Sequence, residues 1–321
     1  MTQAASDSYV VNLTPPDIKP YRAGNTGIDY VTRLDSGVPG PHVMVTAVVH
    51  GNELCGAIAV DHLFRNDIRP SQGTLSLGFC NIAAYQSFDA SNPTVSRYVD
   101  EDFNRLWTPE VLDGDRDSVE LRRARELRPY MDGVDLLLDI HSMQHATAPL
   151  MMAGPLAKGR RLAKGVAVPE TVVSDAGHAA GKRMRDYAGF GDEASEKNAL
   201  LVECGQHWET ACAEVAIETT YRFLVETGAI DQAMAEPHLN GTPPQLQTFI
   251  EVSGPVTITS DDFRFVENYR GLEVIAEAGT VIGHDGDTPV ETPYDNCVLI
   301  MPSRRLNRGA SAVRLGRYID A

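Results

Sequence analysis

Residues 43–54 read VMVTAVVHGNEL, and the rest of the chain can be interpreted outward from this stretch. The apolar, β-branched run from Val43 to Val49 predicts a buried strand. It ends in His50-Gly51-Asn52-Glu53, after which apolar residues recur at helical spacing as far as Phe64. In open α/β sheets, ligands bind beyond the carboxyl ends of the strands, and His and Glu are common zinc ligands. The stretch therefore predicts a metal site where a strand turns into a helix.

Two later strand-like runs also end in residues that suit a metal-dependent site. Residues 134–140 read VDLLLDI and lead into His141, and residues 200–203 read LLVE and end in Glu203. We expect His50, Glu53 and His141 to ligate zinc and to leave one position open for water. Zinc lowers the pKa of such a water to about 7, and Glu203 would be the general base that takes its proton and passes it to the leaving group. A structural role is the alternative for each histidine taken alone.

Composition limits the class of partner. The 321 residues suggest two domains, and 43% of them are hydrophobic, enough for a sizeable core. The formal net charge of −16 argues against nucleic acid and anionic membranes as partners, because both require basic surface. No apolar run approaches the roughly 20 residues of a transmembrane helix. We therefore expect a small-molecule substrate, and leave open whether the chain forms a homo-oligomer.

Cysteine usage and the first residues predict a cytoplasmic location. The five cysteines are odd in number and contain no CxxC pair, which is typical of reduced thiols. The N-terminal residues show neither the basic nor the apolar region of a signal peptide.

The remaining pattern predicts an α/β domain followed by a β domain. Residues 1–40 are expected to form edge strands and turns, and residues 73–81 a second strand. Residues 117–120 (DSVE) have the spacing of a capping box and predict a helix to about residue 130. Residues 143–198, rich in glycine turns, are expected to form short strands with long loops that wall the substrate pocket. A long helix is predicted for residues 210–226.

The composition changes after this helix. Residues 236–247 (EPHLNGTPPQLQ) predict a linker, and the pattern alternates as in β-strands from residue 248 onward. We therefore divide the chain into a catalytic domain (1–235), the linker (236–247) and a smaller all-β domain (248–321).

Four motifs carry a resemblance to a known family: HGNE at residues 50–53, RYVDEDFNR at 97–105, DIHS at 139–142 and VECG at 202–205. In this order they resemble the succinylglutamate desuccinylase/aspartoacylase family, zinc hydrolases related to the carboxypeptidase A class. The resemblance implies a carboxypeptidase-like α/β fold, a mixed sheet flanked by helices, with a smaller β-rich C-terminal domain. It also implies hydrolysis of the amide bond of N-acyl amino acids.

The resemblance assigns roles to individual residues. It makes His50, Glu53 and His141 the zinc ligands and Glu203 the base. It further implies that Arg97 polarises the scissile carbonyl and that the substrate carboxylate is bound by two neighbours, Asn104 and Arg105. A planar guanidinium can hold a carboxylate by two parallel hydrogen bonds, which agrees with these roles. The alternative for both arginines is an ion pair with an acidic residue among Asp100, Glu101 and Asp102.

The chain departs from the family pattern in the region expected to determine substrate specificity. Members specific for acetylaspartate have an arginine about ten residues before the base, near Glu193 here, but no arginine lies between Asp186 and Glu203. This argues against a dicarboxylic substrate, unless Lys197 replaces the arginine. An acidic residue at this place would instead suit a neutral or cationic side chain.

Three further residues near the motifs have open interpretations. Cys204 follows the base and could be read as a nucleophile, but it lacks an evident activating partner, and an inert thiol is the preferred interpretation. His207 is interpreted as structural rather than as part of the site. His145, four residues after His141, is left open as a residue of the pocket.

The last part of the chain has a resemblance of its own. Residues 271–318 resemble the barrel-sandwich hybrid of biotinyl and lipoyl carriers, yet they contain no lysine that could be modified. We therefore expect no carrier function. The family resemblance implies instead that this domain narrows the active-site channel and that one of its tyrosines contacts the substrate. Tyr294 is its candidate substrate contact; a position on the barrel surface is the alternative.

Together these features predict a zinc-dependent amidohydrolase that deacylates a small N-acyl amino acid or a related amide. A metallocarboxypeptidase acting on short peptides is the first alternative, since it would use the same metal chemistry. A non-catalytic binding protein on the same scaffold is the second.

Overall fold

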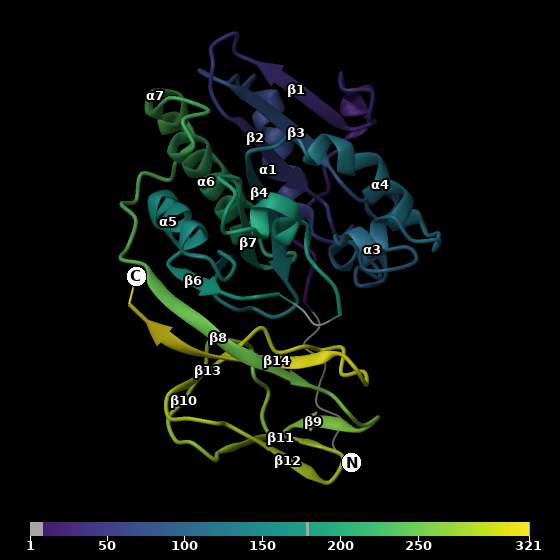
Figure 1. Ribbon diagram of the computed structural model, residues 1–321, viewed down its shortest axis with the longest axis vertical. Helices are drawn as coiled ribbons and strands as arrows, with labels where there is room; N and C mark the ends of the chain where they lie inside the picture. Colours follow the sequence, from purple (N-terminus) through teal and green to yellow (C-terminus); the bar gives the residue numbers. More distant parts are fainter. Residues whose placement is uncertain (1–8, 178–179, 321) are drawn as a thin grey trace.

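The computed structural model describes residues 9–177 and 180–320 (Figure 1). Within them, eleven strands form one large sheet in the order β1-β3-β2-β4-β7-β5-β6-β8-β14-β13-β10. Its first seven strands along the chain are β1 (Val31–Asp35), β2 (His42–Ala47), β3 (Thr74–Phe79), β4 (Leu136–Met143), β5 (Leu150–Met152), β6 (Thr171–Ser174) and β7 (Asn198–Gln206). The other strands are β8 (Thr248–Thr257), β10 (Val274–Ile275), β13 (Cys297–Ile300) and β14 (Ser311–Ile319). A separate three-stranded sheet contains β9 (Phe263–Phe265), β11 (Val281–Asp285) and β12 (Thr288–Glu291).

Helices cover both faces of the large sheet. The α-helices of the described chain are α1 (Leu54–Arg65), α2 (Ile82–Gln86), α3 (Pro109–Leu112), α4 (Val119–Met131), α5 (Ala157–Val166), α6 (Thr210–Glu226) and α7 (Gln232–Ala235). Alternate residues of each strand point to opposite faces. Val43 and Val45 therefore pack with α1, α5 and α6, whereas Met44 packs with α3 and α4 on the other face (Figure 1). This arrangement confirms the predicted α/β class with a mixed sheet flanked by helices.

The central strands place three sequence motifs at one edge of the sheet. β2 is parallel to β4, and β4 is parallel to β7, so the carboxyl ends of all three point the same way. β4 and β7 are in a register that makes His141 and Glu203 direct partners. The predicted strands at residues 43–49, 134–140 and 200–203 are thus confirmed as neighbours.

The sheet continues into the C-terminal part of the chain. β8 begins at Thr248, pairs in parallel with β6 and is antiparallel to β14. In Figure 1, β8 and β14 cross between the helical part and the smaller β part that contains β9 to β13. The division at residues 235 and 248 therefore stays a prediction, because backbone hydrogen bonds join the two proposed domains through β6 and β8.

Two expectations for local structure were wrong. Residues 143–198 contain a ten-residue helix, α5, where only strands and loops were expected. Its sequence, AKGRRLAKGV, includes two glycines that favour a loop interpretation, but Gly159 is small for a packing reason: a Cβ there would lie 1.8 Å from the carbonyl oxygen of Ala153. The helix beginning near residue 118 exists, yet Glu120 does not take part in its capping: Ser118 Oγ accepts a hydrogen bond from Leu121 N–H, and Asp100 Oδ2 accepts one from Val119 N–H.

Glu120, expected to complete the capping box, instead holds the loop that carries the RYVDEDFNR motif. Its fully buried carboxylate accepts hydrogen bonds from the backbone N–H groups of Val99, Asp100 and Glu101, at 2.7 to 3.2 Å. It also accepts one from Asn81 Nδ2 at 3.0 Å. One buried side chain thereby orders the segment immediately after Arg97.

We predict that Glu120→Ala destabilises the protein by at least about 2 kcal/mol, since each buried donor left unsatisfied costs about 1–3 kcal/mol. Urea unfolding followed by circular dichroism measures the difference. Glu126→Ala, on the exposed face of the same helix, is the control and should change stability by less than about 0.5 kcal/mol. Equal stability of the two variants would contradict this role of Glu120.

No helix within the described residues combines the length and apolar character needed to cross a membrane. All five cysteines are buried and unpaired by disulfides.

Candidate metal centre and active site

The turn after β2 holds His50 and Glu53 in a constrained backbone. Val48 has a φ of 53°, an uncommon value for a β-branched residue. Backbone hydrogen bonds from Cys80 N–H to the Ala47 carbonyl and from Asn81 N–H to the Val48 carbonyl, both 2.9 Å, fix this conformation. Gly51 has no room for a side chain, because a Cβ would lie 2.2 Å from the backbone of Ala84. The turn is therefore determined by close packing against the neighbouring strand and loop.

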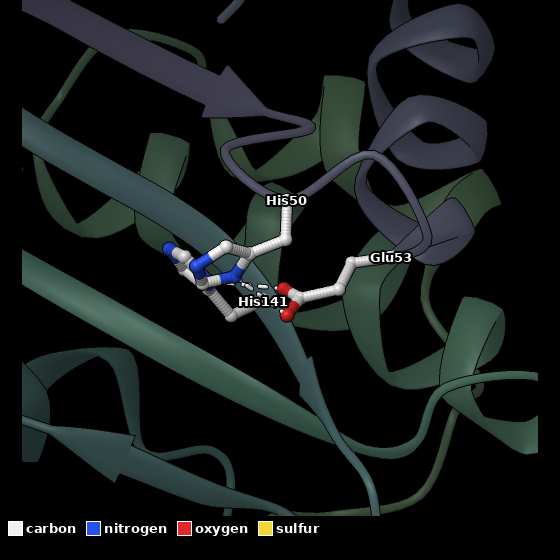
Figure 2. Close-up of side chains that lie close together, drawn as sticks. All are labelled: His50, Glu53 and His141. Carbon is white, nitrogen blue, oxygen red and sulfur yellow. Dashed lines mark hydrogen bonds and ion pairs between the residues drawn. The ribbon is translucent and has the colours of Figure 1, made fainter. Parts of the chain in front are cut away.

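His50, Glu53 and His141 converge from the turn after β2 and from β4 (Figure 2). Their potential ligand atoms all lie within 4.8 Å of one another, and all three side chains are buried. The Glu53 carboxylate lies between the two rings: His50 Nδ1 is 2.7 Å from Oε1, and His141 Nδ1 is 2.9 Å from Oε2 (Figure 2). This is a potential metal site made of two imidazoles and one carboxylate.

The outer ring nitrogens of both histidines are held by further carboxylates. His50 Nε2 is 3.0 Å from Asp102 Oδ1, and His141 Nε2 is 2.8 Å from Asp139 Oδ2. A carboxylate that accepts from Nε2–H leaves Nδ1 as the nitrogen with a free lone pair, directed at the centre of the site. This is the usual arrangement behind metal-binding histidines. The donor set and its outer partners therefore fit a divalent metal ion such as zinc.

Glu53 and His141 favour the charged form of each other. Burial alone would raise the pKa of Glu53, but the adjacent His50 and His141 outweigh it and hold that pKa well below its usual range. Burial would likewise lower the pKa of His141, yet the Asp139 and Glu53 carboxylates raise it well above its usual value. A cation at this centre would replace the protons that the histidines otherwise share with these carboxylates.

Glu203 lies beside this centre in a different environment. Its side chain is buried, and its Oε2 has no hydrogen-bond partner among the described residues. Burial raises the pKa of Glu203 to about 8, although the neighbouring His141 and Arg97 oppose the shift. A buried carboxyl with a free oxygen and a pKa near neutrality has the properties of a general acid–base group.

Arg97 reaches the same place from the loop before α3. Its Nη1 is 3.4 Å from Glu53 Oε1, and its Nη2 is 3.1 Å from Asp102 Oδ2. Its backbone carbonyl accepts a hydrogen bond from Gly51 N–H at 3.1 Å, which joins this loop to the turn after β2. Arg97 thus forms the ion pair with Asp102 that was the alternative to a catalytic role. The pair lies inside the site and not on the protein surface.

Arg105 and Asn104 have separate surroundings. Arg105 lines the pocket, and its Nη1 donates to the Asn104 carbonyl at 2.7 Å. No carboxylate of the described chain pairs with Arg105, so its guanidinium is available to a ligand. Asn104, expected to bind the substrate carboxylate, is not among the residues that line the pocket: it is 3% exposed, and its Oδ1 accepts a hydrogen bond from Met184 N–H at 2.8 Å.

A pocket of about 360 Å³ lies over these residues. The catalytic part contributes His50, Glu53, Arg97, Arg105, His145, Glu203 and His207 to its lining, and the C-terminal part contributes Met301, Pro302, Ser303, Arg305, Val313 and Arg314. Figure 1 shows the C-terminal strands β8 and β14 directly below the helical part. The C-terminal residues therefore form part of the wall of the pocket.

Three of the expected pocket residues lie elsewhere. The Tyr294 hydroxyl is hydrogen-bonded to Ser253 Oγ at 2.6 Å, its ring lies under Arg317, and it is not among the residues that line the pocket. Lys197 donates from Nζ to the carbonyls of Asp132 and Val134, and Glu193 is exposed. Neither Lys197 nor Glu193 lines the pocket, so neither occupies the place of the missing arginine.

Cys204 is buried beneath the site. Burial raises the pKa of its thiol well above the usual value, with Cys55 adding to the shift. A protonated thiol without access to the pocket fits the inert interpretation.

The sequence interpretation missed a buried cluster of ion pairs beside the pocket. Asp175 pairs with Arg183 at 3.1 Å and with Arg314 at 3.2 Å, and Asp186 pairs with Arg183 at 2.6 Å. Arg314 comes from β14, so the cluster connects the C-terminal part to the wall of the pocket. The alternating pattern of residues 311–319 predicts the strand that carries Arg314. It does not predict the acidic partners of the cluster, which lie more than 120 residues away in the sequence.

The comparisons with known proteins agree with this geometry. Residues 39–222 match the model of the succinylglutamate desuccinylase/aspartoacylase catalytic domain. The chain belongs to this family. A probable aspartoacylase from Parasynechococcus marenigrum (strain WH8102) is 32% identical over 105 residues, which are 31% of this chain and 33% of that protein. The match thus spans only about a third of this curated relative.

Solved structures of the succinylglutamate desuccinylase/aspartoacylase family share the fold over most of their length. A member from Rhodobacter sphaeroides is 19% identical, with 91% of this chain and 89% of that chain covered and a TM-score of 0.63. The succinylglutamate desuccinylase of Vibrio cholerae is 15% identical, with 91% and 86% covered and a TM-score of 0.67. Murine aminoacylase 3 is 19% identical, with 88% and 96% covered and a TM-score of 0.59. At these identities the likeness concerns the fold alone.

Asp139 offers a direct test of the metal centre, since it is fully buried and accepts from Thr46 Oγ1 as well as facing His141. We predict that Asp139→Asn weakens metal binding by about 10- to 100-fold, the usual effect of changing the partner behind a metal-binding histidine. Competition with a chromophoric chelator measures the affinity. Asp135→Asn, at an exposed position just before β4, should leave the affinity unchanged; an Asp139→Asn variant that binds equally well would contradict the assignment.

Proposed function

We propose that this chain is a zinc-dependent amidohydrolase that removes the acyl group from a small N-acyl amino acid. The observation that carries the proposal is the convergence of His50, Glu53 and His141 next to a pocket that the buried Glu203 also lines. Two imidazoles and a carboxylate with a free coordination position are typical of hydrolytic zinc sites. Membership of a deacylase family supports the same reaction type.

His50, Glu53 and His141 would hold the metal ion. When bound, such an ion acidifies water and polarises a substrate carbonyl. Glu203 has a free Oε2, takes a proton from the attacking water and later gives it to the amine as the C–N bond breaks. Its raised pKa in the absence of a cation falls when a positive charge is present nearby, because that charge favours the carboxylate form.

Arg97 and Arg105 bind the two oxygen-bearing parts of the substrate. Arg97 is fixed by Glu53 and Asp102, so its guanidinium is preorganised to stabilise the oxyanion that develops on the carbonyl. Arg105 lacks a carboxylate partner in the described chain and would hold the carboxylate of the amino acid. Asn104, bonded to Met184, would act on the substrate through the placement of Arg105.

The C-terminal lining of the pocket favours a small substrate over a peptide. Met301, Pro302 and Arg305 lie over the site and leave about 360 Å³. Incubation of the zinc-loaded protein with N-acetyl amino acids and with matched dipeptides, followed by detection of free amine, tests this choice. We expect release of amine from the N-acyl amino acids; cleavage of the dipeptides alone would favour a carboxypeptidase and overturn the proposal.

A further inference from the structure

Two histidines outside the catalytic pocket, His62 and His238, bring their ring nitrogens together. His62 lies in the last turn of α1, and His238 ends the 3-10 turn Glu236–His238 that follows α7. His62 Nε2 is 3.2 Å from His238 Nδ1, and the two ring centres are 5.2 Å apart. Neither residue lines the catalytic pocket, so the mechanism described above gives this pair no role.

The separation of the two nitrogens fits a metal ion held between them. Two Zn–N bonds of about 2.0–2.1 Å that enclose an angle of about 100°, close to the tetrahedral value, place their nitrogen atoms at the 3.2 Å found for His62 and His238. Two neutral imidazoles share one proton in this contact, and a metal ion would replace that proton. Burial and the nearby His238 lower the pKa of His62, which favours the neutral ring that a metal requires.

Both histidines line a second cavity, of about 740 Å³, whose charge favours a cation. Its wall contains three glutamates, Glu170, Glu214 and Glu218, of which Glu218 is paired with Arg222. No lysine or arginine of the described chain is part of this wall. Thr219 also lines the cavity and is fully buried, and its Oγ1 has no hydrogen-bond partner among the described residues. The cavity therefore has room for an ion with its water molecules, and a free oxygen that can bind one of them.

The surrounding structure holds both rings in place. The Tyr221 ring, from α6, stacks on His238 with centres 4.5 Å apart, and it lies edge-to-face with His62 at 5.8 Å. Glu218 accepts a hydrogen bond from Asn240 N–H at 2.8 Å, which fastens the chain just after His238 to α6. Ligands that are already ordered lose less conformational freedom when they bind an ion. The two nitrogens are thus preorganised.

We propose that His62 and His238 form a second metal site, for a divalent ion that prefers nitrogen ligands, such as Zn²⁺, Cu²⁺ or Ni²⁺. Within the described residues, the pair has no third His, Cys, Asp or Glu at the close range seen in the first centre, so water completes the coordination. The second site is therefore weaker than the three-residue centre, which alone is occupied at one equivalent of zinc. The ion joins α1 to the segment that leads to β8. This inference does not depend on the proposed function.

Zinc titrated into the metal-free, full-length protein tests the site. Isothermal titration calorimetry and equilibrium dialysis should show two ions per chain for the wild type, bound in a tight step and a weaker step. His62→Gln and His238→Gln should each bind one ion, through loss of the weaker step alone. The tight step that remains shows that the variant is folded. His284→Gln removes an imidazole of β11 that does not line this cavity, and it should bind two ions as the wild type does.

Two further measurements separate this site from zinc held by surface carboxylates. Excess Mg²⁺, which prefers oxygen ligands, should leave the weaker step unchanged. In protein labelled with ¹⁵N-histidine, the second equivalent of zinc should shift the imidazole signals of His62 and His238. A single step in the wild type, a weaker step that persists in either variant, or its displacement by Mg²⁺ overturns the second site. None of these results bears on the proposed function.

Discussion

Replacing Glu203 with Gln is expected to lower kcat for amide hydrolysis by about 100- to 10,000-fold, the usual contribution of a general acid–base group. The amide of Gln has nearly the same shape, but it can neither take the proton of the attacking water nor return it to the amine. Glu203 is not one of the three convergent ligand residues, so metal content should remain at one ion per chain. Stopped assays of amine release and atomic emission on the same sample measure both quantities.

The combination of the two readouts makes this test specific. Loss of turnover together with loss of metal would mean that Glu203 is a ligand rather than the base. Turnover within threefold of the wild type would contradict any role of Glu203 in proton transfer. Glu209→Gln, at an exposed glutamate just before α6, is the matched control and should behave as the wild type.

Replacing Glu53 with Gln is expected to have the second large effect, on the metal itself. The neutral amide removes the only carboxylate among the three convergent residues and the charge that faces both His50 and His141. We expect the affinity for zinc to fall by more than the 10- to 100-fold typical of a residue behind a ligand, and activity to fall with it. Titration against a chromophoric chelator gives the affinity.

Added zinc distinguishes binding from chemistry in the Glu53→Gln variant. If Glu53 is a ligand, a high concentration of zinc should restore part of the activity, whereas it should restore none in Glu203→Gln. An unchanged affinity in Glu53→Gln would contradict the assignment of the metal centre.

The metal centre could be predicted from the sequence because each of its parts is local. His50 and Glu53 lie three residues apart at a strand end, and His141 and Glu203 each end a short apolar run. Parallel strands bring their carboxyl ends to one edge, so the three runs needed only to be neighbours in the sheet, and they are. The same reasoning predicts the α1 and α6 helices, whose apolar spacing is regular.

The partners of these residues could not be predicted in the same way. Asp139 lies two residues before His141 and therefore on the same face of β4, but the sequence does not show that its carboxylate is shared between the His141 ring and the Thr46 hydroxyl. Glu120 fits the spacing of a capping box, but the nearby loop offers three backbone N–H groups that compete for its carboxylate. Such contacts depend on how separate loops pack, which spacing along the chain does not encode.

The substrate side of the pocket was the least predictable part. The family pattern points to an arginine before Glu203, whereas Arg305 lines the pocket from a position about 100 residues later in the chain. Tyr294, the residue chosen from the C-terminal part, instead packs within that part against Ser253 and Arg317. The pairing of β6 with β8 is what brings residues 301–314 over the site, and this long-range parallel pairing leaves no short motif.

The most direct measurement of the central claim is amide hydrolysis of an N-acyl amino acid before and after removal of metal from the same protein sample. We expect chelation to abolish the release of amine and one equivalent of zinc per chain to restore it. Zinc titrated into the Glu203→Gln variant should give no recovery. Hydrolysis that continues at the original rate after the metal has been removed would contradict the account.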